Sequence, residues 1–179
     1  MDDVSIRREI NILLEKASAS KYCEPQRTIQ LSKHALLLSE KIGYTLGEKV
    51  AKAYMAYSYH SIGNDEEALE LIYISLHYFI KEGFYDLIWL AYNLLGIIFT
   101  ELGDIEKSMD FYDKAQIVAI KIDLGKRYDK KANSKRAIML TLNNIAENYK
   151  LLNAYKEALS YSERAYKIDS LYDYSLSSG

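Results

Sequence analysis

Apolar residues recur every three or four positions along nearly the whole chain, and polar residues fill the positions between them. This spacing places the apolar side chains on one face of a helix. Short breaks containing glycine or asparagine separate the periodic segments, and Pro25 is the only proline that could interrupt a helix. The pattern predicts eight helices, at residues 3–18, 26–42, 46–62, 65–82, 84–102, 105–122, 133–152 and 155–170.

The predicted helices form pairs, because one stretch of sequence recurs along the chain with shifts of forty and then fifty residues. The copies are residues 55–75, 95–115 and 145–165. Three positions in each copy always carry a small residue: Ala56, Ala68 and Ser75, then Gly96, Ser108 and Ala115, then Ala146, Ala158 and Ala165. Small residues at fixed offsets let the two helix backbones of a pair approach closely.

Glycine and asparagine mark the predicted turns. Six of the eight glycines lie at the breaks between periodic segments: Gly43, Gly47, Gly63, Gly83, Gly103 and Gly125. Gly63, Gly103 and Asn153 follow the first helix of a copy, where a left-handed backbone is expected. Asn64 is expected to cap the next helix, with Glu67 as its capping-box partner.

These features resemble the tetratricopeptide repeat family, whose unit is a helix–turn–helix. The copy at 95–115 follows the family pattern in order, with Leu95-Gly96, Phe99, Gly103, Ser108, Tyr112 and Ala115. The copies at 55–75 and 145–165 match less fully, and residues 5–42 resemble a degenerate first copy in which Thr28 and Ala35 fit. The period of about forty residues resembles the long repeats of kinesin light chains, of peptide-responsive bacterial regulators and of sensor segments in bacterial signalling enzymes.

The resemblance implies an all-α fold, a right-handed α-solenoid of four helix–turn–helix pairs. The pairs are expected at residues 3–42, 46–82, 84–122 and 133–170, as a single solenoid over residues 1–170. Residues 171–179 are expected to form a C-terminal tail or the truncated start of a further repeat. The first helix of each pair is expected to line the concave face, as it does in the family.

Composition and motifs give no sign of catalysis. The chain has a single cysteine, and it lacks phosphate-binding glycine loops and nucleophile-elbow motifs. His34, His60 and His77 lack the spacing of metal ligands, and His77 lies in an apolar helix, where a core or boundary position is expected. We therefore expect no catalytic residue, no metal site, no cofactor and no enzyme activity, although a catalytic domain beyond residue 179 is compatible with this expectation.

The composition also bears on partners and location. No stretch reaches the roughly 18 apolar residues that span a membrane, and the acidic first residues do not begin a signal peptide. With a net charge of −2, neither nucleic acid nor an anionic membrane is an expected partner. A cytoplasmic protein is therefore expected.

One segment between the third and fourth predicted pairs departs from the repeat and is basic. Its cations are Lys126, Arg127, Lys130, Lys131, Lys135 and Arg136. A solvated loop explains such a charge run, and a contact surface for an acidic partner is the functional alternative.

The favoured function is a non-catalytic scaffold that binds a protein or peptide segment, as the resemblance implies. Asn93 and Asn143 occupy the same position in their copies, although asparagine is a mediocre helix former. An amide both donates and accepts, so it can hold a peptide backbone. The predicted groove residues are Asn93, Asn143, Asn144, Tyr57, His60, Ile97, Thr100, Glu147 and Lys150. In the alternative, both asparagines only bond to a neighbouring helix and stabilise the stack.

Two other functions fit the sequence. One is the N-terminal sensory or regulatory module of a larger bacterial signalling enzyme, such as a diguanylate cyclase or a histidine kinase. The other is homo-oligomerisation, because the C-terminal pair at residues 133–170 is expected to leave an apolar face open for self-association. That face is expected to include Leu159, Tyr166 and Ile168.

Overall fold

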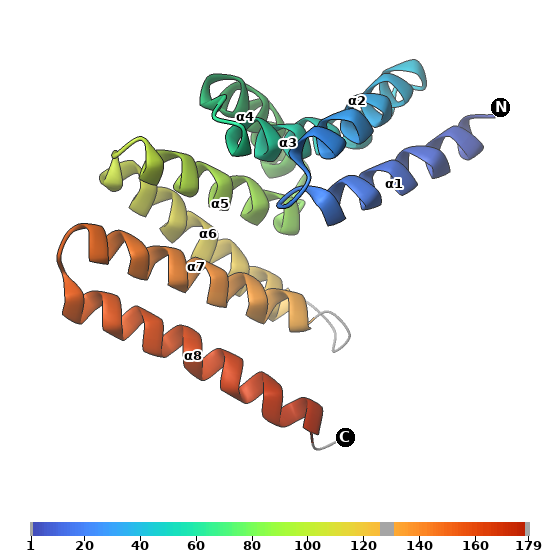
Figure 1. Cartoon of the computed structure of the whole chain (residues 1–179). Coiled ribbons are helices and arrows are strands. Elements are labelled where there is room, and N and C mark those ends of the chain that lie inside the picture. The colour runs from blue at the N-terminus through green and yellow to red at the C-terminus, as the bar shows by residue number, and fades with distance from the viewer. Residues whose placement is uncertain (1, 126–130, 178–179) are drawn as a thin grey trace. The chain divides into compact units, whose positions relative to one another are not determined.

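The computed structural model describes residues 2–125 and 131–177, with side chains over residues 2–122 and 135–168. These residues form eight helices and no strand (Figure 1). The helices are α1 (Asp3–Ser20), α2 (Pro25–Lys41), α3 (Thr45–Ser61), α4 (Asp65–Glu82), α5 (Tyr85–Glu101), α6 (Ile105–Gly125), α7 (Lys131–Leu151) and α8 (Tyr155–Ser177). The prediction of an all-α chain of paired helices is confirmed. Helix α8 continues beyond its predicted end at residue 170, so that residues 171–177 belong to it.

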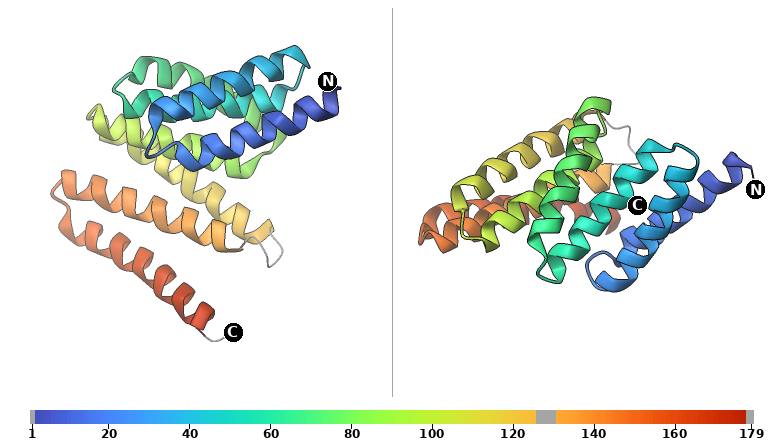
Figure 2. Two further views of the ribbon diagram at one scale, coloured as in Figure 1. Left: turned by 45° about the vertical axis from the view of Figure 1, so that its right-hand side comes forward. Right: turned by 90° about the horizontal axis from the view of Figure 1, so that it is seen from above.

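The described helices form two compact units. Unit 1 (Met1–Glu82) contains α1 to α4, and unit 2 (Gly83–Gly179) contains α5 to α8. Within each unit every helix packs against the next one in the chain, and the first helices of successive pairs also touch, α1 with α3 and α5 with α7. Figure 2 shows the two helices of each pair side by side in further views. This is the packing of an α-solenoid.

The small residues of the repeat lie where the two helices of a pair meet. All nine are buried, and Ala158, for example, is only 3% exposed. Gly96 of α5 lies so close to Tyr112 of α6 that a Cβ at residue 96 would overlap the tyrosine ring. The close approach predicted from the sequence is therefore present in the copies at 55–75, 95–115 and 145–165.

Left-handed residues end the first helix of a pair, as predicted. Gly103 has a φ of +78°, and Asn153 has a φ of +58°. After α7, the amide of Ala154 donates to the carbonyl oxygen of Tyr149 at 2.9 Å, which gives the helix the six-to-one hydrogen bond of a Schellman motif. Gly47 differs from the prediction, because it lies inside the first turn of α3 rather than at a break. A Cβ on Gly47 would come within 2.5 Å of Ser39 Oγ, so close packing explains this glycine.

Capping side chains start several helices. The Asp104 carboxylate accepts from the amide of Lys107 at 3.1 Å, and the hydrogen bonds from Lys107 lower the pKa of Asp104. Asn64 accepts from the amide of Glu67 at 3.4 Å, and its own Nδ2 donates to the Glu67 carboxylate at 3.4 Å. The predicted partnership of Asn64 and Glu67 is confirmed, although the second contact uses the Asn64 side chain rather than its backbone amide.

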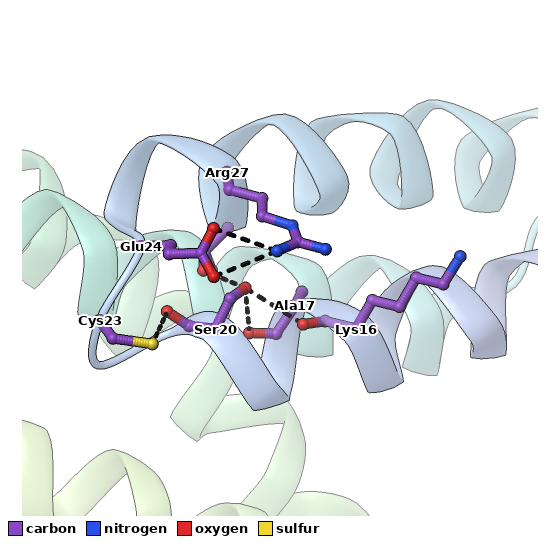
Figure 3. A network of polar contacts seen from close by, with 7 residues as sticks. Lys16, Ala17, Ser20, Cys23, Glu24 and Arg27 are labelled. Atoms are coloured by element: carbon purple, nitrogen blue, oxygen red, sulfur yellow. Dashed lines mark hydrogen bonds and ion pairs between the residues drawn. The ribbon is translucent and has the colours of Figure 1, made fainter.

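The turn between α1 and α2 is held by a local polar network (Figure 3). Arg27 pairs with the Glu24 carboxylate at 3.0 Å. The Cys23 thiol donates to the carbonyl oxygen of Ser20 at 3.7 Å. The Ser20 hydroxyl also lies 2.8 Å from the hydroxyl of Thr28, which belongs to α2. A buried hydroxyl contact thus joins α1 to α2.

Replacing Gly103 with valine is expected to lower the free energy of unfolding by about 1 kcal/mol or more, because a β-branched residue is strained at positive φ. Gly103→Asn should cost clearly less, since asparagine tolerates the left-handed region. Urea unfolding followed by circular dichroism measures both. Equal stability of wild type and Gly103→Val would contradict the left-handed turn.

Candidate functional site

A ring of polar side chains joins three helices of unit 2. Asn148 of α7 is 0% exposed, and its Nδ2 donates to Ser108 Oγ of α6 at 2.8 Å. Its Oδ1 accepts from Thr100 Oγ1 of α5 at 2.9 Å. The Thr100 and Ser108 hydroxyl oxygens are 2.7 Å apart, which closes the ring. Because each hydroxyl both donates and accepts, the three side chains can satisfy one another without water.

Tyr112 of α6 lies beside this ring and is 2% exposed. Burial raises the pKa of its hydroxyl to about 12, against the opposing effect of hydrogen bonds with Thr100 and Ser108. The phenol therefore stays neutral at physiological pH. Its ring also fills the space left by the missing side chain of Gly96, so the polar ring and the close helix contact are parts of one arrangement.

Two further hydrogen bonds join α5 to α7. Asn144 Nδ2 donates to Asn93 Oδ1 at 3.0 Å, and Trp89 Nε1 donates to Thr141 Oγ1 at 3.0 Å. Asn93 is only 6% exposed. Asn93 and Asn144 therefore bond to each other across two neighbouring helices. This is the arrangement expected if such asparagines stabilise the stack.

Asn143 has a different environment from Asn93, although the two residues are equivalent in the repeat. It is exposed on α7, together with Glu147 and Lys150, which follow it at spacings of four and three residues. These spacings place the three side chains on one face of the helix. Lys150 Nζ and Glu147 Oε2 are 2.9 Å apart in a solvent-exposed ion pair. The three residues, which we call the α7 polar stripe, form an accessible polar surface.

The difference between the two asparagines follows from their neighbours. Asn93 lies on α5 and is covered by α7, which contacts α5 through Asn144. Among the described helices, α7 contacts α5, α6 and α8, and none of them covers Asn143. A shared position in the repeat thus gives a buried structural amide in one pair and an exposed amide in the next.

The remaining predicted groove residues of unit 2 are partly engaged in the fold. Ile97 of α5 is half-buried. Thr100, also half-buried, belongs to the ring with Ser108 and Asn148. Neither is as accessible as the α7 polar stripe.

Tyr57 and His60 belong to α3 in unit 1. Tyr57 is 3% exposed, and its ring meets that of Tyr22 edge-on with the centroids 5.6 Å apart. His60 Nδ1 lies 2.7 Å from the carboxylate of Asp65, the first residue of α4. Both side chains therefore fit a role in joining helices of unit 1 better than the predicted contact with a peptide.

The basic segment is described only in part. Lys126, Arg127 and Lys130 lie outside the described residues. Lys131 is the first residue of α7, and its side chain is likewise not described. Lys135 is half-buried and Arg136 is exposed on the same helix. The acidic-partner surface therefore stays a prediction.

Side chains suited to metal binding or catalysis do not gather in the described part of the chain. No group of three or more His, Cys, Asp or Glu residues there could hold a metal ion. His77 is exposed on α4, so the expected core or boundary position was wrong. The apolar residues Tyr73, Ile74 and Ile80, which share its face of the helix, are exposed as well. Over the residues described, no helix has the length and hydropathy needed to cross a membrane.

Sequence reasoning missed the ring around Asn148. A signal for it exists in the repeat, because Asn148 aligns with Ile98 and Ser58, both of which are buried. A polar residue at a position that is buried in every copy calls for a buried hydrogen-bond partner. The hydroxyls at positions 100 and 108 are those partners.

Helix pairs joined by left-handed turns, stacked through their first helices, define an α-solenoid. The tetratricopeptide repeat model matches residues 90–116 and 141–170, both in unit 2. The resemblance seen in the sequence is thereby confirmed, and the chain contains tetratricopeptide repeats. Repeats of this family typically serve as scaffolds for protein–protein interaction.

A solved structure supports the fold assignment. The chain is similar to the crystal structure of BtubC (BKLC) from P. vanneervenii, with a TM-score of 0.72 and 16% sequence identity. The similarity covers 92% of this chain and 64% of that chain, so this chain spans less than two thirds of the length of BtubC. At this identity the likeness shows the fold. A search of curated proteins found no match to the sequence.

Asn148→Ala is expected to lower the free energy of unfolding of unit 2 by about 1–3 kcal/mol, because it leaves the Thr100 and Ser108 hydroxyls buried with fewer partners. Asn143→Ala, the matched exposed change on the same helix, should alter it by less than about 0.5 kcal/mol. Trp89 is the only tryptophan, so its fluorescence during urea unfolding reports on unit 2. Equal effects of the two substitutions would contradict the buried ring.

Alkaline pH is expected to destabilise unit 2 through Tyr112. The folded state keeps the phenol proton up to about pH 12, whereas the unfolded state loses it near the ordinary value of 10.0. Between these values the unfolded state binds fewer protons, so stability falls as the pH rises. Tyr112→Phe should flatten this fall in urea titrations followed by circular dichroism. A slope unchanged by the substitution would show that Tyr112 titrates normally.

Proposed function

We propose that the chain is a non-catalytic scaffold that binds an extended peptide segment, and that the α7 polar stripe of unit 2 contacts the peptide. The observation that supports this most directly is the exposure of Asn143 on α7, next to Glu147 and Lys150. The tetratricopeptide repeats of unit 2 make protein binding the typical role for such a surface.

The chemistry of the α7 polar stripe suits a peptide backbone. An extended peptide has amide donors and carbonyl acceptors that are not satisfied internally, and a carboxamide such as Asn143 can bind one of each. Glu147 lies one turn and Lys150 two turns further along α7, and the two side chains bear opposite charges. In this proposal the amide binds the peptide irrespective of sequence, and the two charges select among side chains.

Asn93 and Asn144 have a supporting role in the proposal. Their mutual hydrogen bond fixes α7 against α5, so it sets the position of the stripe without contacting the ligand. Substitution of Asn93 should therefore weaken binding only through a loss of stability. The roles of Asn93 and Asn143, which occupy equivalent positions in the repeat, can then be separated by experiment.

The test uses peptides selected from a display library against the wild-type chain, with binding measured by fluorescence anisotropy. Asn143→Ala is expected to weaken binding by about tenfold or more, since hot-spot contacts have effects of this size, and to leave the melting temperature unchanged. Asn93→Ala is expected to lower the melting temperature. Asn11→Ala, an exposed asparagine on α1, is the matched control and should change neither quantity.

The outcome separates the two interpretations of the asparagines. If selected peptides bind Asn143→Ala as tightly as wild type, the stripe is not the binding surface. If Asn143→Ala lowers the melting temperature as much as Asn93→Ala does, the amide at position 143 is structural, and the proposal fails.

A further inference from the structure

The outer side of α8 repeats a surface that is covered elsewhere in unit 2. Helix α6 packs against both α5 and α7, whereas α8, among the described helices, packs against α7 alone. On α6 this surface consists of four residues that are half-buried or buried: Ile105, Met109, Tyr112 and Gln116. Fifty residues on, three of the four equivalent positions of α8 are exposed: Tyr155 at 66%, Leu159 at 60% and Tyr166 at 71%, with Ser162 half-buried between them.

These residues of α8 form one narrow stripe. Tyr155, Leu159, Ser162 and Tyr166 follow at spacings of four, three and four residues, which places them along one side of a helix. Helix α8 lies beside α7 (Figure 1). The buried residues Ala158 and Ala165 mark the neighbouring face of α8. We call the four residues the α8 stripe. Ile168, predicted to share this face, is half-buried and lies outside the stripe.

Charges beside the stripe make it complementary to itself. Lys156 and Glu163 are both exposed on α8, seven residues apart, on the solvent side of the stripe. In two antiparallel copies of α8 related by a two-fold axis, Lys156 of each copy lies near Glu163 of the other. A two-fold interface uses the same patch twice, so it requires a patch that matches itself in both shape and charge.

We propose that two copies of this chain associate through the α8 stripe, with the two α8 helices antiparallel about a two-fold axis. The contact covers the α8 stripe as α7 covers the equivalent side of α6 in the third pair. In this register Leu159 lies nearest the two-fold axis, Tyr155 and Tyr166 lie toward the ends of the contact, and the pairs of Lys156 with Glu163 border it. This proposal is independent of peptide binding, which uses α7.

Sedimentation velocity over a concentration series tests the proposal on the full chain. Wild type is expected to convert from monomer to dimer as its concentration rises. Leu159→Lys should raise the dimer dissociation constant by about tenfold or more, because it places a charge at the centre of the apolar contact. Leu37→Lys is the matched control, since Leu37 is an equally exposed leucine, 66%, on α2, and it should leave the dissociation constant unchanged.

Charge reversal tests the antiparallel arrangement. Lys156→Glu and Glu163→Lys each place like charges opposite one another in a homodimer, so each alone should weaken self-association. An equimolar mixture of the two variants restores opposite charges at both contacts and should associate as wild type does. Circular dichroism of each variant confirms that it is folded.

Three results overturn the proposal. The first is a wild-type chain that stays monomeric at the highest attainable concentration, which includes the case in which the stripe binds another protein. The second is a dimer that Leu159→Lys and Leu37→Lys affect equally. The third is a mixture of the two charge variants that associates no better than either variant alone.

Discussion

The close approach of the two helices in a pair, made at small side chains, is the constraint on which the rest of the structure depends. At Gly96 the approach is so close that the Tyr112 ring occupies the place of a side chain. It also brings the Ser108 hydroxyl within 2.8 Å of the Gly96 carbonyl oxygen. A larger residue at position 96 would displace Tyr112 and with it the polar ring that holds α7. Helix pairing and pair stacking are therefore coupled through one contact.

The same close packing is completed in two chemical ways. In the first and third pairs the second helix places a hydroxyl at the contact, and it meets a hydroxyl eight residues earlier in the chain: Thr28 with Ser20 at 2.8 Å, and Ser108 with Thr100 at 2.7 Å. In the second and fourth pairs the equivalent residues are Ala68 and Ala158, which pack without a polar partner. Serine is close to alanine in volume, so the backbone spacing survives the exchange between Ser108 and the alanines while the hydrogen bonding changes, and Thr28 adds one methyl group to serine.

Sequence reasoning succeeded where the physics is local to a helix or a turn. The spacing of apolar residues, the left-handed residues Gly103 and Asn153 and the small contact positions all follow from rules that act within one pair. The roles of Asn93, Asn143 and Asn148 depend on which helix lies alongside, and no pattern within a pair contains that information. The extension of α8 to Ser177 was missed, although its signal is local: no glycine or proline interrupts the sequence between Tyr155 and Ser177. Gly47 was misassigned because a glycine needed for close packing looks the same in a sequence as one needed for a turn.

The two accessible surfaces of the fourth pair differ in a way that suits different kinds of partner. The α7 polar stripe exposes an amide and two opposite charges, and an extended peptide needs such groups because its backbone is unsatisfied. The α8 stripe exposes two aromatic rings and the side chain of Leu159, and its polar groups are hydroxyls rather than amides or charges. It therefore suits a helix, whose backbone is already satisfied internally. In the third pair both surfaces are covered by α7, the first through Asn93 and the second through the packing of α6. The two surfaces that the fourth pair offers to a partner are therefore the equivalents of surfaces that α7 covers in the third pair.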